Sequence, residues 1–360
     1  MPGRPPKPRD GRRLKNAPTG FPLFYDKRKP RVVTSDPWAF LAHHATTKLP
    51  KDRERIALAY IEQAFDFFEA TSNPQLGSKP LLHYYCFLNL VKAALLIKGV
   101  SLPTAVGHGI SDPRVNRRQR LRFTGQRVHI TGRAHDHSQL FPEFLQLLNA
   151  AHLLNSTCKV ITMLGNIPSI HRTFTQVTGD DPIFLPVKRF DFMHAGGQIW
   201  LRVVLNRHDK DVELVRPTIS RRQRFRRWLD LVHAPNPDEF WYETAPVQGR
   251  NRAVDRAIGT LATRISGVGA ASILTSTGYR MYLSASPPGT WCPRLAASYA
   301  VAFYLGSITR YQPHDFDKIV AGGYRWLVEE FLATEPIQFI YTLASWLAGV
   351  DVVKPYATSR

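Results

Sequence analysis

The chain has 360 residues, and its 48 lysines and arginines outnumber its 28 aspartates and glutamates, which gives a formal net charge of +20. This balance excludes an acidic solubility tail. Three widely spaced cysteines, Cys86, Cys158 and Cys292, exclude a small disulfide scaffold and are typical of a reducing compartment. Hydrophobic residues make up 44% of the chain, which is enough to bury one large core or two modest ones.

The first residues are basic, but no apolar segment of the kind found in secretory signals follows them. The two longest apolar stretches, residues 81–97 and 337–353, are interrupted by polar side chains and fall short of a clean membrane span. We therefore expect a soluble, cytoplasmic protein that does not contact a membrane.

Residues 1–35 hold ten lysines or arginines and only two acids, and five prolines precede residue 20. Such a segment buries too little apolar surface to offset the entropy of ordering it. We expect a disordered basic arm, which is either solvated or in contact with nucleic acid.

Residues 36–175 are expected to form an N-terminal helical region. Helical periodicity indicates helices over Asp52–Ala70 and Lys79–Lys98, and the second is apolar nearly all round, so it belongs at the centre of a domain. Residues 117–137 alternate around Thr124 and Gly125, as a basic β-hairpin does, and a helix over residues 139–156 follows.

Residues 176–290 are expected to form a mixed α/β region, and residues 291–353 a C-terminal three-helix region packed on the N-terminal helices. The fold class predicted is α+β, predominantly helical with inserted antiparallel β-hairpins. The elements expected here are strands over 183–192, 198–206, 212–215 and 271–284, and helices over 217–232, 252–265, 292–310, 316–333 and 337–349.

The sequence lacks the marks of several common chemistries. It has no phosphate-binding GxxxxGK[ST] loop and no GxGxxG after a strand. It also has no carboxylate two places before a lysine, as the common metal-dependent nuclease core requires. His135 and His137 have metal-ligand spacing, but no third ligand is identifiable, so we expect neither a metal nor another cofactor.

Metal-independent ribonucleases of the HEPN type pair an arginine that holds phosphate with a histidine that transfers a proton. Five Arg–His pairs have a suitable spacing, which is about what chance gives for this composition. Arg226 and His233 are the most interesting pair, because a separation of seven residues places both on one helix face. We assign no catalytic residue, and His108, Arg226 and His233 remain weak candidates.

Two arginine clusters are the strongest signal for function. Arginine suits bidentate phosphate contact, and the interleaved Phe123, Phe225 and Trp228 suit stacking on bases. A simple solvated face is the alternative interpretation. The first cluster extends to Arg133, and the second also contains Arg216, Arg226 and Arg227. The nucleic-acid-binding candidates are Arg114, Arg117, Arg118, Arg120, Arg122 and Arg127 in the first cluster and Arg221, Arg222 and Arg224 in the second.

Polar residues within the apolar helices need partners. Asn89 and Lys92 lie on the central helix, and Arg310 ends a C-terminal helix before Pro313. We predict that helix Lys79–Lys98 packs against Leu295–Arg310 and brings Asn89 or Lys92 near Tyr311. Each of these apolar helices has a polar residue or end that needs a partner, and packing them together gives both a partner.

The runs KPLLHYYCFLNLVKAALL, GHGISD, LGNIPSIHRTF and YAVAFYLGSITRYQPHDF resemble the YaaC-like proteins, a poorly characterised bacterial family, and the likeness is scattered over about residues 36–350. The resemblance implies a cytosolic, largely helical protein without an established activity, and its helices are faintly similar to HEPN domains. The family-motif residues it implies are Tyr84, Tyr85, Asn89, Lys92, His108, Ser307, Arg310 and Tyr311, followed by Pro313.

Three hypotheses follow. The first is a nucleic-acid-binding protein, for RNA or DNA, that acts as an accessory subunit of a bacterial defence or RNA-processing system. The second is a metal-independent ribonuclease that uses His108 or His233 with nearby arginines. The third is a protein-interaction subunit whose positive charge meets an acidic partner. The sequence leaves open whether the protein is an enzyme, and we expect that it is not. The oligomeric state does not follow from the sequence.

Overall fold

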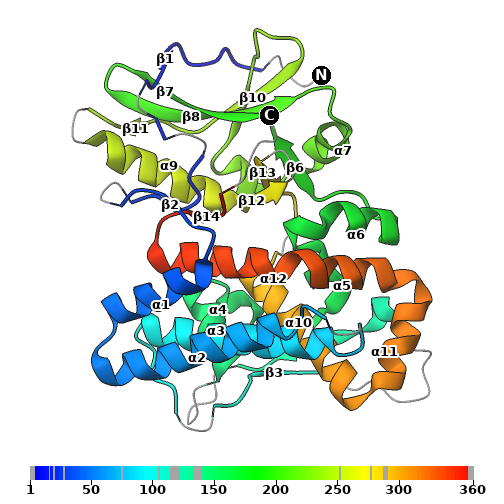
Figure 1. Ribbon diagram of the computed structural model, residues 1–360. Coiled ribbons are helices and arrows are strands. Elements are labelled where there is room, and N and C mark those ends of the chain that lie inside the picture. Colours follow the sequence, from blue (N-terminus) through cyan, green and yellow to red (C-terminus); the bar gives the residue numbers. More distant parts are fainter. Residues whose placement is uncertain are drawn as a thin grey trace. The chain divides into compact units, whose positions relative to one another are not determined.

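The computed structural model describes residues 5–15, 17–18, 21–26, 29–73, 76–103, 106–113, 122–132, 139–250, 253–275, 278–286 and 291–355. The chain forms two compact units, which we call the helical unit and the sheet unit (Figure 1). The helical unit comprises Thr34–Asp180 and Gly289–Leu347, and the sheet unit comprises Met1–Val33, Asp181–Pro288 and Ala348–Arg360. The fold is α+β and largely helical, as the sequence predicted.

The helical unit contains most of the helices and one small sheet. Its main helices are α1 (Pro37–Lys48), α2 (Lys51–Glu69), α3 (Lys79–Ile97), α4 (Leu140–Leu147), α5 (Val160–Gly165), α6 (His171–Thr178), α10 (Arg294–Tyr311), α11 (Pro313–Ile319) and α12 (Arg325–Ala348). Short helical turns lie at η1 (Phe123–Gly125), η2 (Ala151–Leu153), η3 (Pro168–Ile170) and η5 (Val320–Tyr324), and the strands are β3 (Ile110–Ser111), β4 (Arg127–Ile130) and β5 (Ser156–Lys159).

Helix α3 lies at the centre of this unit and packs against α2 and α10. It is apolar nearly all round, so burial on several sides is the arrangement that removes most apolar surface from water. Gly306 of α10 lets the two helices approach closely, because a Cβ atom there would lie 2.8 Å from the Cβ of Tyr84. Helix α3 is the one described helix with the length and hydropathy of a membrane span, and 72% of that window is buried inside the protein, as in the core helix of a soluble protein.

A buried ion pair ties α12 to α10. The carboxylate of Glu335 is fully buried and accepts two hydrogen bonds from the guanidinium of Arg294, at 2.9 and 2.7 Å. The hydroxyls of Ser298 and Ser169 also donate to this carboxylate. All three donors compensate the cost of burying the charge.

The predicted basic hairpin is only partly present. Thr124 and Gly125 lie in η1, and β4 pairs antiparallel with β3 and with β5, so its partners come from outside the expected hairpin. Residues 114–121 and 133–138 lie outside the described residues. The helix expected over 139–156 is also wrong: α4 ends at Leu147, and Ser156 begins β5, whose pairing with β4 overrides the local helical periodicity.

The sheet unit holds the larger sheet and three helices. Its strands are β1 (Arg12–Arg13), β2 (Val32–Val33), β6 (Phe184–Val187), β7 (Arg189–Ala195), β8 (Gln198–Asn206), β9 (Asp230–Val232), β10 (Glu239–Glu243), β11 (Val247–Gln248), β12 (Ala270–Thr275), β13 (Gly278–Ser284) and β14 (Val352–Val353). Its helices are α7 (Lys210–Ile219), α8 (Gln223–Arg226) and α9 (Val254–Val268).

The main sheet has the order β1-β7-β8-β10-β9, with β11 also pairing with β8. Strands β7 and β8 form the hairpin that the sequence predicted, and Gly196 and Gly197 at its turn both have positive φ. The apolar core contains Ile199, Leu201, Val203 and Leu205 of β8, together with buried residues of α7 and α9. Every second residue of β8 therefore points into this core.

Other elements between residues 210 and 232 differ from the prediction. Residues 212–215, expected as a strand, lie in α7, because Val212, Val215 and Ile219 form a helical apolar stripe and Asp209 caps the helix by accepting from the backbone N–H of Asp211. The helix expected over 217–232 is interrupted as well. The chain leaves α7 at Ser220, forms the short α8, and then enters β9, which pairs with β10.

The N-terminal segment has an ordered place in the sheet unit, contrary to the disordered arm we expected. Strand β1 pairs with β7, and Phe21 is buried and stacks on Phe190 with 4.3 Å between ring centroids. The arginines find carboxylates: Arg9 pairs with Glu243 and Arg13 with Asp191. Neutralisation by these buried acids is the physical reason that a basic segment can be ordered here.

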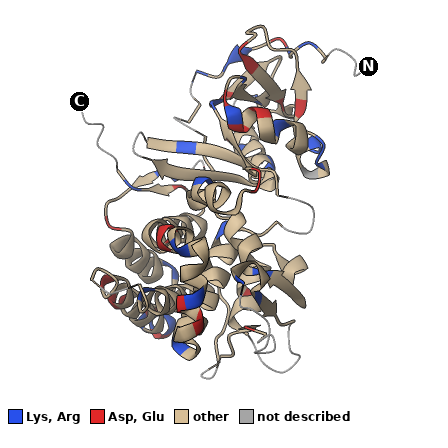
Figure 2. Cartoon of the chain, turned by 90° about the vertical axis from the view of Figure 1, so that its right-hand side faces the viewer, with Lys and Arg blue, Asp and Glu red and all other residues tan. Residues whose placement is uncertain are grey.

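These acids belong to a ladder of charges across three neighbouring strands. Arg202 of β8 lies opposite Asp191 of β7 and opposite Glu243 of β10, and it donates to the Glu243 carboxylate at 2.7 and 2.9 Å. Lys188 and Arg189 likewise donate hydrogen bonds to the buried carboxylate of Glu239. The hydrogen bond from Arg189 is the main cause that lowers the pKa of Glu239 to about 2. Figure 2 shows basic and acidic positions interleaved in this part of the fold.

Candidate functional site

The predicted arginine clusters are only partly described. Arg114, Arg117, Arg118 and Arg120 lie outside the described residues, and Arg122 and Arg127 are exposed beside η1 and on β4. Phe123 is buried at 1% exposure, so it packs in the core and does not present a ring to a base.

The second cluster lies on α8 and the turn before it. Arg221 is exposed and Arg222 is half-buried, and Arg224 lies in α8. Arg226 is exposed on α8, but His233 follows β9, so the expected pairing of these two on one helix face is wrong. The backbone N–H of His233 donates to the carbonyl of Pro6 instead.

Two arginine–aromatic stacks occur in the sheet unit. The guanidiniums of Arg227 and Arg264 lie 4.9 and 5.2 Å from the ring centroid of Trp228. Those of Arg207 and Arg216 lie 4.4 and 4.0 Å from the centroid of Phe240. We call these six residues the arginine–aromatic surface. A guanidinium over a ring face is held by cation–π attraction, which leaves most of its N–H donors for other partners.

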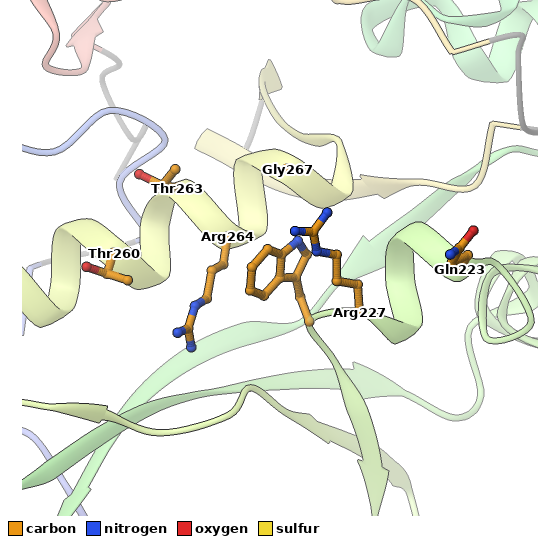
Figure 3. A pocket seen from close by; sticks show the side chains of 7 residues that line it. Gln223, Arg227, Thr260, Thr263, Arg264 and Gly267 are labelled. Atoms are coloured by element: carbon orange, nitrogen blue, oxygen red, sulfur yellow. The ribbon is translucent and has the colours of Figure 1, made fainter. Parts of the chain in front are cut away.

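The Trp228 stack borders an open pocket of about 910 Å³ between α8 and α9. Figure 3 shows Thr260, Thr263 and Arg264 along α9, with Gln223 and Arg227 coming from the other side. Gly267 lies beside the indole, since a Cβ atom there would be in van der Waals contact with Nε1 of Trp228 at 3.6 Å. The pocket therefore combines two cations, one aromatic ring and small polar side chains.

None of the four arginines of this surface has an ion pair with any residue in the described part of the chain. The Nε atom of Arg216 is buried without a hydrogen-bond partner, as is that of Arg222. The sequence prediction missed Arg264 and Arg207. The available signal for Arg264 was a helical arginine with no acid three or four residues away on either side.

Family-motif residues gather in the helical unit. The hydroxyl of Tyr84 lies 2.8 Å from Nδ1 of His108, and Nη1 of Arg310 donates to the hydroxyl of Tyr85 at 2.7 Å. The ring of Phe303 of α10 packs edge-on against Tyr84, with 5.5 Å between centroids. These residues come from α3, α10 and the loop before β3.

Lys92 completes this group, which we call the tyrosine–histidine cluster (Tyr84, Tyr85, Lys92, His108 and Arg310). It is half-buried two turns beyond Tyr85 on α3, and its Nζ lies 5.1 Å from the ring centroid of Tyr60. Burial lowers the pKa of Lys92. Burial also lowers the pKa of His108, and the charges of Lys92 and Arg310 add to the effect.

The expected packing of α3 against α10 is confirmed, but the partners differ from those we named. Arg310 meets Tyr85, and Lys92 meets Tyr60 of α2. The C-terminal end of α10 packs against the first turns of α3, where Tyr85 lies. Lys92 lies two turns beyond Tyr85 on α3, so it meets α2 instead. Asn89 is buried at 4% exposure, Ser307 is half-buried and Tyr311 is 57% exposed beside Arg310.

Among the described residues, no group of three or more histidines, cysteines or carboxylates is arranged to hold a metal ion. Cys86 and Cys292 are fully buried in apolar surroundings, and this burial raises the pKa of each thiol. A thiol of that kind is a packing residue and not a nucleophile.

The fold and these clusters define a largely helical α+β protein built around a tyrosine-bearing core helix, with a basic sheet unit. The model of the YaaC-like protein family matches residues 23–347, so the chain belongs to that family. No curated protein and no solved structure gives a significant match.

Proposed function

We propose that this YaaC-like protein binds single-stranded nucleic acid in the cytoplasm through the arginine–aromatic surface of the sheet unit. The observation that carries the proposal is the pair of contacts in which the guanidiniums of Arg227 and Arg264 lie over Trp228 and those of Arg207 and Arg216 lie over Phe240. Guanidiniums contact phosphates bidentately, and rings stack on bases, so the two together suit an unpaired strand.

The distribution of charge supports this choice of surface. Several N-terminal arginines are already neutralised inside the fold, since Arg9, Arg13 and Arg31 pair with Glu243, Asp191 and Asp351. The arginine–aromatic surface has no such internal partner among the described residues. An overall charge of +20 attracts a polyanion from a distance, and arginines without a carboxylate partner among the described residues offer it a place to dock.

The test is binding of a fluorescein-labelled single strand of about 20 nucleotides, as RNA and as DNA, measured by fluorescence anisotropy. We expect affinity to fall steeply between about 50 and 200 mM salt, with a slope of about 0.7 for each phosphate contacted. The double variant Arg227→Gln/Arg264→Gln is expected to lose at least about tenfold in affinity and to reduce the slope. Trp228→Leu is expected to cost about 1–3 kcal/mol, the usual contribution of one stacked base.

Arg256→Gln is the matched control, because Arg256 is exposed on α9 and lies outside the pocket. Equal losses per charge for Arg256 and Arg264 would reject a localised site in favour of a diffuse positive surface. Absence of binding at low salt would reject the proposal and favour an acidic protein partner. Cleavage of the labelled RNA in the presence of EDTA would instead favour a metal-independent ribonuclease.

A further inference from the structure

The tyrosine–histidine cluster lies in the helical unit and shares no residue with the arginine–aromatic surface, so the proposed function does not account for it. Two hydrogen bonds build it, one from Arg310 to the Tyr85 hydroxyl and one between the Tyr84 hydroxyl and His108. Both tyrosines are fixed by rings: Tyr85 stacks on Phe67 at 5.2 Å, and Tyr84 packs against Phe303. The side chains are therefore held in place before any ligand arrives.

This cluster brings positive groups together without an acid. Neither Lys92 nor Arg310 forms an ion pair with any residue that the structure describes, and Arg310 donates to the Tyr85 hydroxyl and lies over the ring of Tyr311. Both charges disfavour protonation of His108, so both act on the imidazole. Two positive charges that both act on one imidazole raise the free energy of the empty protein, and an anion bound beside His108 relieves that repulsion.

The imidazole is suited to donate to such an anion. Burial raises the pKa of Tyr84, so its phenol keeps its proton and can donate it to Nδ1 of His108. A neutral imidazole that accepts at Nδ1 carries its own hydrogen on Nε2. The His108 residue is exposed at the surface, although partial burial of its ring lowers its pKa.

We propose that Lys92, His108 and Arg310 form a binding site for a phosphate monoester group. The charge match favours a monoester over the internal diester of a nucleic acid, because a monoester carries about −1.5 to −2 at pH 7 and a diester carries −1. The two fixed cations balance a dianion. The phosphate belongs either to a small molecule such as a nucleotide or to the phosphorylated end of a nucleic acid strand.

The experiment follows the His108 imidazole by NMR in the full chain labelled with ¹³C-histidine, with His108→Gln to assign the signal. Four probes are added in turn: inorganic phosphate, adenosine 5′-monophosphate, and one oligoribonucleotide with either a 5′-phosphate or a 5′-hydroxyl. Binding of a dianion is expected to raise the pKa of His108 by about one unit or more. A response to the first two probes identifies a small-molecule site, and a response confined to the 5′-phosphorylated strand identifies a strand end.

Variants separate this site from a general charge effect. Arg310→Gln and Lys92→Met are each expected to weaken phosphate binding at least tenfold. Lys98→Met is the matched control, since Lys98 follows the same helix but lies over Trp346. The absence of any His108 shift at millimolar phosphate, or an equal loss with Lys98→Met, would overturn the proposal. The titration with inorganic phosphate does not involve the arginine–aromatic surface. One of the two proposals can therefore be rejected without rejecting the other.

Discussion

His83 is a buried histidine on α3 that no carboxylate compensates among the described residues. It is 3% exposed, and its Nδ1 atom has no hydrogen-bond partner. Burial, followed by the charge of Lys79, lowers its pKa to about 4, while a hydrogen bond with the backbone of Leu332 acts in the opposite direction. The folded protein therefore prefers the neutral imidazole far more strongly than the unfolded chain does.

The stability of the protein should depend on pH through His83. Because the folded pKa is below the unfolded value of about 6.5, this contribution is fully present above pH 6.5 and is lost as the pH falls towards 4. The linked loss is roughly 3 kcal/mol at the low end of that window. Urea unfolding from pH 7 to 4 measures it, with His83→Gln as comparison. Parallel pH profiles for the two proteins would show that His83 is not the group responsible.

Helices α3 and α10 approach each other closely at Gly306. A methyl group there would meet the Cβ of Tyr84 at 2.8 Å and the carbonyl oxygen of Pro80 at 3.4 Å. Neither neighbour is the end of a flexible side chain. The same contact fixes Tyr84, and through it the position of His108.

Gly306→Ala is expected to destabilise the protein by about 1–3 kcal/mol, the usual cost of overpacking a tight contact. Gly322→Ala is the matched control, because a Cβ atom there meets nothing within 4 Å and the residue has a negative φ of −78°. Unfolding free energies from urea titration compare the two. We also expect Gly306→Ala alone to change the NMR signal of His108; equal stability of the two variants would contradict a close-packed helix pair.

At the scale of the whole molecule, the N-terminal segment completes the sheet unit. Arg9 donates to the carboxylate of Glu243 and to the carbonyl of Thr244, and Glu243 is fully buried. The neighbouring Arg12 is exposed on β1 and has no acidic partner among the described residues. Two nearby arginines of equal charge thus have different surroundings.

Arg9→Gln is expected to lower the free energy of unfolding by about 1–3 kcal/mol, because it leaves a buried carboxylate with one partner fewer. Arg12→Gln should change it by no more than about 0.5 kcal/mol. Thermal or urea unfolding measures both, and nucleic-acid affinity is measured alongside. If both variants weaken binding equally and leave stability unchanged, the segment acts as a binding arm after all.

Several features of the fold were predictable because their signals are local. The helices at residues 52–70 and 79–98 follow from apolar periodicity, and the β7–β8 hairpin follows from two apolar runs around a Gly-Gly turn. Residues 212–215 and 139–156 were assigned wrongly. The helix over residues 212–215 depends on Asp209 as its N-cap. The strand that replaces the end of the helix expected over 139–156 depends on pairing between β5 and β4, about 30 residues earlier.

For the candidate sites, the sequence by itself determined which residue types are present: an excess of arginine, a tyrosine-bearing core helix, and motif residues such as His108 and Arg310. Only the tertiary structure decided which of them meet. It placed Arg264 against Trp228, joined Arg310 to Tyr85, and used Arg9 to neutralise Glu243. The physical reason is that ion pairs and cation–π contacts act over a few ångströms, while the residues they join lie as many as 320 positions apart in the sequence. Periodicity reports which side of an element is apolar, and only packing decides which partner that side meets.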